Sequence, residues 1–159
     1  MNSKILTLDQ LRTESGRLRL EGKRVVATNG CFDVLHVGHV RYLTAAKQLG
    51  DILVVGLNSD ASVRQLKGAD RPINPEADRA EILAALTVVD HVVIFADMRV
   101  NRLITILRPD LYVKGGDYSV DSLDRGEVDA LRSVGAEIRI LPLVPGRSTT
   151  RLIEAIQKT

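Results

Sequence analysis

The sequence is short of aromatic residues and of cysteine, and each shortage excludes a class of protein. Aromatic residues make up 3% of the chain and tryptophan is absent, so platforms that stack single-stranded bases have little to be built from. The single cysteine, Cys31, cannot form a disulfide within the chain. No apolar run is long enough to cross a bilayer, and the first residues do not resemble a signal peptide. We therefore expect a cytoplasmic protein that binds neither nucleic acid nor a membrane.

A strong charge of either sign is also missing. The 22 basic and 20 acidic residues leave a formal charge of +2, which favours a small anion over a polyanionic surface as a partner. With 159 residues, 45% of them hydrophobic, the chain can bury a core as one globular domain. We expect a single domain over residues 1–159, in which residues 1–22 are a helical extension and residues 23–159 form the core.

Short β-branched runs alternate with longer segments of helical periodicity, which is typical of βα units. The pattern predicts an α/β fold with a doubly wound, five-stranded parallel sheet whose helices lie on both faces. The strands are expected at Arg24–Thr28, Ile52–Leu57, His91–Phe95, Leu111–Lys114 and Glu137–Leu141.

Capping and stop signals predict the helices between these strands. Thr7 and Gln10 form a capping box for a helix over Leu8–Leu20, and Asn74 caps a helix that has Pro75 at its first position. The remaining ends are set by glycine or proline after the last apolar residue. The further helices are expected at His36–Leu49, Ala61–Leu66, Pro75–Leu86, Val100–Leu107, Asp124–Val134 and from Ser148 onward.

In a doubly wound sheet the ligand site lies beyond the carboxyl ends of the strands, where the winding reverses. The loops to inspect are therefore "NGCFDVLH" after the first strand, "GGDYSVD" after the fourth and "PLVPGRSTT" after the fifth. Neither the G-x-G-x-x-G spacing of dinucleotide enzymes nor the Walker pattern occurs in them. The sequence thus points away from hydride transfer and from γ-phosphoryl transfer, toward another use of a nucleotide.

Two of the three histidines stand at the start of a predicted helix, with Gly38 between them. Positions three apart on a helix share a face, so His36 and His39 can present their rings to one object. The free N–H groups and the positive end of the helix dipole suit a phosphate there.

Two other interpretations of the histidine pair stay open at this point. A zinc site would need three or four ligands, and Cys31, distant acids and His91 are the only further candidates. The two histidines could instead be solvated or cap the helix. Cys31 fits a small packed residue better than a nucleophile, because no basic neighbour in sequence lowers its pKa.

The segments "GCFDVLHVGH" and "GRSTT" together resemble the two signatures of the cytidylyltransferase-like nucleotidyltransferases. "NSD", "LKG", "RPINPEADR" and "VKGGDY" follow in the family's order, so the resemblance runs from about Lys23 to Lys158. Within the family, the segments are most similar to members that adenylylate D-glycero-β-D-manno-heptose 1-phosphate.

The resemblance implies a Rossmann-like nucleotidyltransferase fold and transfer of AMP from ATP to that sugar phosphate, giving ADP-heptose and pyrophosphate for lipopolysaccharide core synthesis. His36, His39 and Lys67 would be catalytic. Asp33, Lys67 and Arg79 would bind the sugar phosphate; alternatively, Arg79 forms an ion pair on its helix and Asp33 serves as a turn residue. The nucleotide would be bound by Asn29, Gly30, Cys31, Phe32, Gly38, Gly115, Asp117, Val144, Arg147, Ser148 and Thr149.

The same resemblance implies Mg²⁺ with ATP, a homodimer, and a heptose kinase and phosphatase that act beforehand. The metal ligands stay unassigned, because magnesium takes most of its ligands from phosphate and water. Relatives that use CTP carry Arg-Thr-Glu-Gly-Ile where this chain has Leu143-Val144-Pro145-Gly146-Arg147, which disfavours CTP. Two alternatives remain: a cytidylyltransferase for glycerol 3-phosphate or a similar polyol phosphate, and a nucleotide-binding module without activity.

Overall fold

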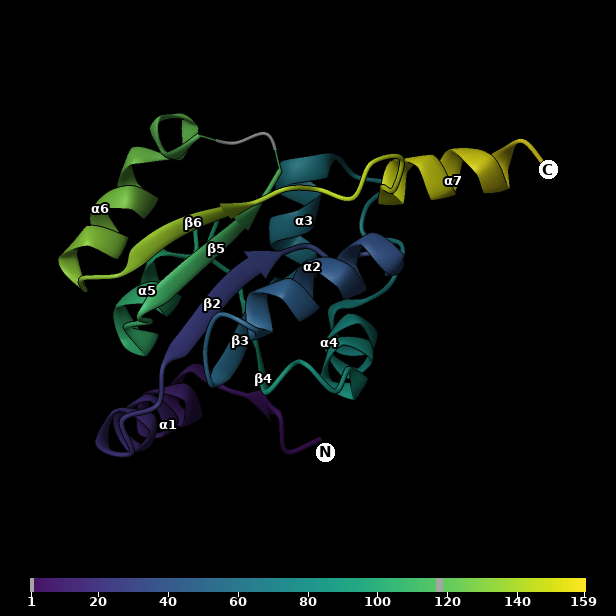
Figure 1. Ribbon diagram of the computed structural model, residues 1–159. Helices are drawn as coiled ribbons and strands as arrows, with labels where there is room; N and C mark the ends of the chain where they lie inside the picture. The colour runs from purple at the N-terminus through teal and green to yellow at the C-terminus, as the bar shows by residue number, and fades with distance from the viewer. Residues whose placement is uncertain (1, 117–118) are drawn as a thin grey trace.

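The protein was analysed as a computed structural model that describes residues 2–116 and 119–159. Its centre is a parallel sheet with the strand order β1-β4-β3-β2-β5-β6, in which the winding reverses between β2 and β5 (Figure 1). The strands are β1 (Ile5–Leu6), β2 (Val25–Gly30), β3 (Ile52–Asn58), β4 (His91–Phe95), β5 (Leu111–Gly115) and β6 (Glu137–Leu141). Asp117, predicted to bind the nucleotide, lies outside the described residues.

The sheet has six strands, so the prediction of five was wrong by one edge strand. β1 pairs with β4 through Ile5 opposite Val92 and Leu6 opposite Val93. A two-residue strand shows no alternation of its own, and its pairing is decided by the neighbour that it meets in space. The five predicted strands are all present, with β2, β3 and β5 each extending past the predicted end.

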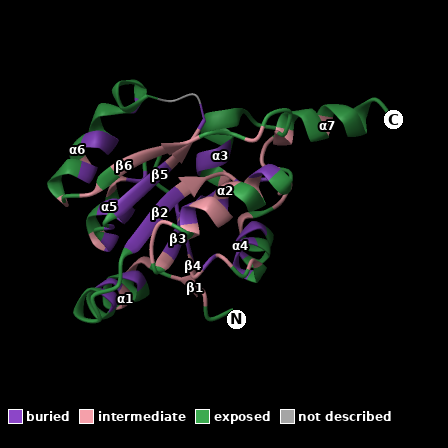
Figure 2. Ribbon diagram, viewed as in Figure 1, coloured by how far each residue is buried: buried purple, intermediate pink, exposed green. Residues whose placement is uncertain are grey.

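Helices cover both faces of the sheet, as the doubly wound pattern predicts. One core cluster packs α2 (Val37–Lys47) and α4 (Glu76–Ala85) against the sheet through residues such as Leu43 and Leu83. The other packs α1 (Leu8–Leu20), α5 (Asn101–Leu107) and α6 (Arg125–Ser133) through residues such as Leu11 and Leu103. The middle strands lie buried between these layers (Figure 2). α3 (Asp60–Lys67), a 3₁₀ turn (Val120–Ser122) and α7 (Thr149–Gln157) complete the chain.

The helix starts agree with the predicted caps except at α4. Thr7 and Gln10 form the predicted capping box of α1. At α4, however, Pro75 is the N-cap residue and no side chain caps the helix. The predicted cap, Asn74, instead donates its side-chain N–H to the carbonyl of Asp33 at 2.7 Å, because the loop before α4 lies against the first loop.

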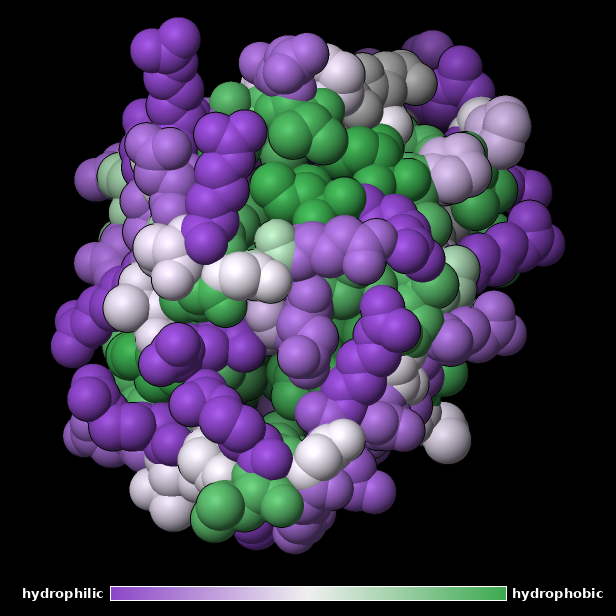
Figure 3. All heavy atoms as spheres, turned by 60° about the vertical axis from the view of Figure 1, so that its left-hand side comes forward, coloured by the Kyte–Doolittle hydropathy of each residue, from purple (hydrophilic) through white to green (hydrophobic). Residues whose placement is uncertain are grey.

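α7 projects away from the body of the molecule (Figure 1). None of its residues is buried, and Leu152 and Ile156 are 37% and 71% exposed. On the side that Figure 3 brings forward, hydrophilic side chains spread over the surface with hydrophobic ones between them, mostly in its upper half. No helix among the described residues is long and apolar enough to span a membrane.

Candidate active site

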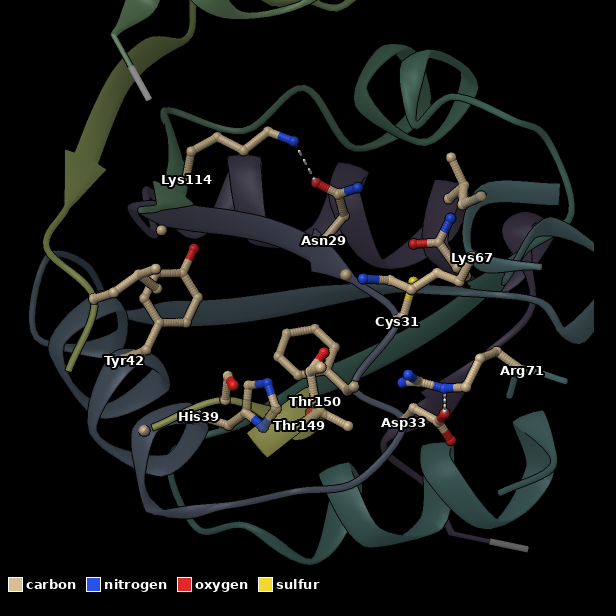
Figure 4. A pocket seen from close by; sticks show the side chains of 18 of the residues that line it. Asn29, Cys31, Asp33, His39, Tyr42, Lys67, Arg71, Lys114, Thr149 and Thr150 are labelled. Atoms are coloured by element: carbon tan, nitrogen blue, oxygen red, sulfur yellow. Dashed lines mark hydrogen bonds and ion pairs between the residues drawn. The ribbon is translucent and has the colours of Figure 1, made fainter. Parts of the chain in front are cut away.

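A cavity of about 760 Å³ opens at the carboxyl ends of the central strands, on the side where the winding reverses. The β2–α2 loop, the end of α3, the end of β5 and the start of α7 all contribute to its wall (Figure 4). Every predicted site residue that the structure describes lies in this wall except Arg79: Asn29, Gly30, Cys31, Phe32, Asp33, His36, Gly38, His39, Lys67, Gly115, Val144, Arg147, Ser148 and Thr149.

The two histidines are joined to each other through the first turn of α2. His36 is the N-cap residue, and its Nδ1 accepts a hydrogen bond from the Gly38 N–H at 3.0 Å. The Nδ1 of His39 in turn accepts from the His36 N–H at 3.4 Å. A neutral imidazole whose Nδ1 accepts a hydrogen bond carries its proton on Nε2. Both rings therefore offer an Nε2–H donor while their Nδ1 atoms satisfy the helix start, so capping and ligand binding coexist.

The environment keeps both imidazoles uncharged near neutral pH. Burial, reinforced by the neighbouring His36, lowers the pKa of His39 to about 4. Burial and then the charge of Arg147 lower the pKa of His36. A neutral imidazole can donate one hydrogen bond to a phosphate through its Nε2–H, and a bound phosphate would in turn raise the pKa of the ring.

Phe32 and two glycines hold the histidine pair in place. The Phe32 ring meets His39 edge-on with 5.3 Å between ring centroids. A Cβ at Gly30 would lie 2.9 Å from the Phe32 ring, and a Cβ at Gly38 would lie 2.7 Å from Cε1 of His36. A side chain at either position would collide with a ring, since Phe32 lies against the backbone of Gly30 and His36 against that of Gly38.

The start of α7 faces the same cavity as the start of α2. Ser148 is the N-cap residue and accepts the Arg151 N–H at 3.1 Å, while the Thr149 hydroxyl donates to the carbonyl of Val34 at 3.1 Å. Arg147 precedes the cap and lines the cavity. Two helix N-termini, one arginine and two imidazoles therefore converge on one space, an arrangement suited to a polyphosphate.

Asp33 does not present a free carboxylate to the cavity. Its oxygens accept from Arg71 Nε at 2.7 Å and from the backbone N–H groups of Ile73 and Asn74 at 2.8 and 2.9 Å. Burial alone would raise the pKa of Asp33, but these hydrogen bonds outweigh it and the pKa is lowered. The alternative prediction, a turn residue that bonds within its own loop, does not describe Asp33 either, because its carboxylate joins the first loop to residues forty positions away.

Arg79 lies beneath the cavity, and this corrects the expectation that it contacts the acceptor phosphate directly. Its side chain is fully buried, and it donates to the carbonyls of Asn74, Cys31 and Asn58 at 2.9, 2.6 and 2.9 Å. Its remaining nitrogen forms an ion pair with Asp60 at 2.7 Å. The guanidinium thus holds together the loops after β2 and β3 and the loop before α4. Its ion pair with Asp60 is not the predicted one along its own helix.

Cys31 and Lys67 both line the cavity, and their side chains lie next to each other in Figure 4. Burial raises the pKa of the Cys31 thiol even though Lys67, Arg79 and Arg71 oppose the rise, which agrees with a packed residue and not a nucleophile. Lys67 ends α3 and is followed by Gly68 at a φ of 102°, a conformation that favours glycine.

The cavity wall also contains residues that the sequence did not single out. Tyr42 hydrogen-bonds Thr28 and lies against Gly115, where a Cβ would be 3.0 Å from its ring. Arg71 reaches the cavity from the loop before α4. The position of Lys114 directly before Gly115 and Gly116 could have indicated a place in the site. Glu127 lies inside a predicted helix, and nothing in its sequence neighbourhood indicates a place in the site. The remaining residues are Asn58, Leu66, Met98, Arg99, Val100, Asp124, Leu143 and Thr150.

The described residues contain no group of three or more His, Cys, Asp or Glu side chains placed to hold a metal ion. His91, a further candidate for a zinc site, lies at the amino end of β4, away from the cavity at the carboxyl ends of the strands, and its Nε2 lies 3.1 Å from Oε1 of Glu14. It is therefore remote from His36 and His39.

Comparison with known proteins agrees with this geometry. Residues 27–155 match the cytidylyltransferase-like family model. The chain is 53% identical to the "Bifunctional protein HldE" of Citrifermentans bemidjiense over 98% of its own length and 31% of the relative's. It is 49% identical to the protein of that name from a Nitratiruptor species, over 96% of this chain and 32% of the other. The chain thus spans about a third of these relatives.

Two solved structures share the fold. One is described as a lipopolysaccharide core biosynthesis protein from Thermoplasma volcanium; it is 29% identical with a TM-score of 0.64, over 77% of this chain and 98% of the other. The second is a pantoate-β-alanine ligase from Francisella tularensis, 14% identical with a TM-score of 0.58, over 96% of this chain and 76% of the other. At that identity the second likeness speaks for the fold alone.

Proposed function

This chain belongs to the cytidylyltransferase-like family, and from that premise we propose that it is an adenylyltransferase acting on D-glycero-β-D-manno-heptose 1-phosphate. The products would be ADP-heptose and pyrophosphate, with ADP-heptose serving as a precursor of the lipopolysaccharide core. The likeness to the Thermoplasma volcanium protein, which is named for lipopolysaccharide core biosynthesis, supports a place in that synthesis.

The observation that carries the proposal is the pair of neutral imidazoles at the start of α2. Their Nδ1 atoms accept backbone N–H groups, so their Nε2–H groups are free to donate to the triphosphate. Such fixed donors stabilise the charge that grows on the α-phosphate oxygens in the transition state. His36 and His39 are therefore the residues that we assign to this role.

In the proposed reaction an oxygen of the acceptor phosphate attacks the α-phosphorus of ATP. The bond from that phosphorus to the bridging β-oxygen breaks, and pyrophosphate leaves with the bond's electron pair. We assign the β- and γ-phosphates to Arg147 and the start of α7, with Ser148 and Thr149. The enzyme contributes alignment and fixed charge, so no covalent intermediate is needed.

The acceptor phosphate needs cations on the other side of the α-phosphate. Lys67 at the end of α3 and Arg71 in the loop before α4 both line the cavity there. Only the Nε of Arg71 is engaged by Asp33, so its two terminal nitrogens remain available for a phosphate in the fork geometry that arginine provides. We assign Arg71 the direct contact that the sequence analysis gave to Arg79.

The nucleotide would lie along Asn29, Gly30, Phe32 and Gly115, with its base near Leu143 and Val144. The apolar side chains there and the absence of the Arg-Thr-Glu-Gly-Ile stretch favour adenine over cytosine in this proposal. Mg²⁺ would arrive with ATP and neutralise phosphate charge, taking its ligands mainly from phosphate and water. Of the carboxylates in the cavity wall, Asp33 is already saturated by protein donors and is not assigned to the metal.

A steady-state assay of pyrophosphate release tests the proposal. ATP, CTP and GTP are each paired with heptose 1-phosphate, in both anomers, and with glycerol 3-phosphate. The proposal expects turnover with ATP and the β-anomer of the heptose. Turnover confined to CTP with glycerol 3-phosphate would establish the alternative cytidylyltransferase, and ATP binding by calorimetry without any turnover would establish a binding module.

The acceptor would be supplied by a heptose kinase and a phosphatase, in the cytoplasm where ATP is available. We also propose that the protein is a homodimer whose contact includes α7. Leu152 and Ile156 are exposed on this helix, and Arg151 can face Glu154 of an antiparallel second copy. Sedimentation should give a dimer for the wild type and a monomer for Ile156→Arg; a monomeric wild type contradicts this assignment.

A further inference from the structure

A second group of polar side chains lies in the cavity, at the ends of β2 and β5 and in the first turn of α6. Asn29, Lys114 and Glu127 line the cavity, and the buried Tyr112 lies behind them; we call these four residues the Glu127 cluster. Asn29 Oδ1 accepts from the Tyr112 hydroxyl and from Lys114 Nζ, the latter at 3.3 Å. Lys114 Nζ also lies 3.0 Å from Glu127 Oε1. Lys114 and Asn29 are on the side of the cavity opposite Asp33 and Arg71 (Figure 4).

Glu127 is the unusual member, because its carboxylate is buried with unused hydrogen-bonding capacity. The residue is 8% exposed and lines the cavity. Among the described residues, none gives its Oε1 a hydrogen bond of good geometry, so the contact with Lys114 is an ion pair only. A buried carboxylate is costly unless its oxygens receive hydrogen bonds, which indicates that another donor completes this site.

The position of Glu127 in α6 does not explain its burial. Asp124 is the N-cap residue and accepts the Glu127 N–H at 3.1 Å, which makes Glu127 the third residue of the helix. A glutamate there ordinarily reaches back to the backbone N–H of the N-cap residue. Here the carboxylate is instead within ion-pair distance of Lys114. The side chain therefore serves the cavity and not the end of its own helix.

The charges and donors of the Glu127 cluster select the class of ligand. The carboxylate and the ammonium compensate each other, so neither an anion nor a cation gains by binding between them. Together they offer an acceptor and a donor side by side, and Asn29 adds an amide N–H. A hydroxyl group both donates and accepts, and neighbouring hydroxyls on one ring match this alternation.

We propose that the Glu127 cluster binds the hydroxyl groups of a sugar ring, with Glu127 accepting from one hydroxyl while Lys114 donates to another. This inference rests on the proposed function, which brings two sugars to the cavity: the acceptor heptose and the ribose of ATP. Both present neighbouring hydroxyls. Glu127 and Lys114 then discriminate between substrates by the hydroxyls that these carry, since a buried acceptor left unpaired rejects an analogue that lacks its donor.

The test compares Glu127→Gln and Lys114→Met with the wild type. Glu81→Gln is the matched control, because Glu81 is an exposed carboxylate on α4 outside the cavity wall. The KM of each substrate is measured, with 2′-deoxy-ATP and 3′-deoxy-ATP as additional substrates. We expect both cluster variants to raise one KM by about 10-fold or more, the scale of a hydrogen bond to a charged group, and the control to change neither.

The KM values show which of the two sugars the Glu127 cluster binds. A raised KM for the heptose phosphate alone assigns the acceptor, whereas a raised KM for ATP together with lost discrimination against a deoxy-ATP assigns the ribose. Unchanged KM values for both substrates in folded Glu127→Gln and Lys114→Met overturn the inference. If the wild type releases no pyrophosphate with any pair, the proposed function has failed, and calorimetry of the same variants with ATP and heptose 1-phosphate still decides whether the cluster binds a sugar.

Discussion

The rings of His36 and His39 are stacked, with 3.9 Å between their centroids and 27° between their planes. Two protonated imidazoles at this separation would repel each other strongly, and the lowered pKa of His39 reflects burial first and this neighbour second. The pair is therefore arranged to act in its neutral form, with both Nδ1 atoms committed to backbone N–H groups. Four predictions concern this pair and the loops that support it.

Gly38→Ala should displace the His36 ring and lower turnover without unfolding the protein. A Cβ at this position would lie 2.7 Å from Cε1 and 2.8 Å from Nδ1 of His36, so the ring must move away from the Gly38 N–H. We expect kcat to fall by about 10-fold or more, since loss of orientation of one transition-state donor is costly.

Gly16→Ala is the matched control for that substitution. Gly16 lies inside α1, and nothing comes within 4 Å of an added Cβ. Alanine should raise the stability of the protein by about 0.5–1 kcal/mol and leave kcat unchanged. Equal kcat values for the wild type and Gly38→Ala would contradict the assigned role of the His36 ring.

The stability of the protein should fall as the pH is lowered from about 6.5 toward 4. The pKa of His39 is about 4 in the folded state against 6.5 for a free imidazole, so between these values the unfolded chain binds more protons. Protonation then favours unfolding. The measurement is the urea midpoint from pH 7.5 to pH 5 for the wild type and for His39→Gln.

We expect the midpoint of His39→Gln to depend less steeply on pH than that of the wild type. Parallel profiles for the two proteins would show that His39 titrates normally. Bound ATP should also raise the pKa of His39, because the triphosphate stabilises the imidazolium, and an NMR titration of the ring protons would record the shift.

Arg79→Met should destabilise the protein instead of specifically weakening acceptor binding. Removing the guanidinium leaves Asp60 and the carbonyls of Cys31 and Asn58 without their donor. Breaking a buried ion pair typically costs about 3–5 kcal/mol, which chemical denaturation would measure. Arg102→Met, at an exposed position of α5, should stay within about 0.5 kcal/mol of the wild type. If Arg79→Met keeps full stability and raises the KM for the sugar phosphate, Arg79 contacts the acceptor phosphate directly and the structural role assigned to it is wrong.

Much of this architecture could be predicted from the sequence because the signals are local. β4 and β6 have the predicted bounds, His91–Phe95 and Glu137–Leu141, and α1 occupies the predicted Leu8–Leu20 after its capping box. The loops after β2 and before α7 could be placed at one edge of the sheet, because parallel strands direct their carboxyl ends to the same side. Residues from those two loops do line one cavity.

What could not be predicted depends on contacts between distant parts of the chain. Asp33 meets the backbone of Ile73 and Asn74, and nothing near Asp33 in sequence reveals that pairing. Arg79 has the charge of a phosphate ligand, but its direction is set by four acceptors from the loops around it. Glu127 and Lys114 come together only because α6 packs beside β5, so a helix pattern alone shows Glu127 as one more polar residue.

The most direct test of the proposed mechanism is the kcat of His39→Ala in the pyrophosphate assay with ATP and heptose 1-phosphate. Circular dichroism and a thermal melt of the same sample serve as controls for folding. Loss of one transition-state donor predicts a fall in kcat by about 10²–10³ in a folded protein. A folded His39→Ala protein that turns over at the wild-type rate would contradict the claim that the histidine pair stabilises the reacting phosphate.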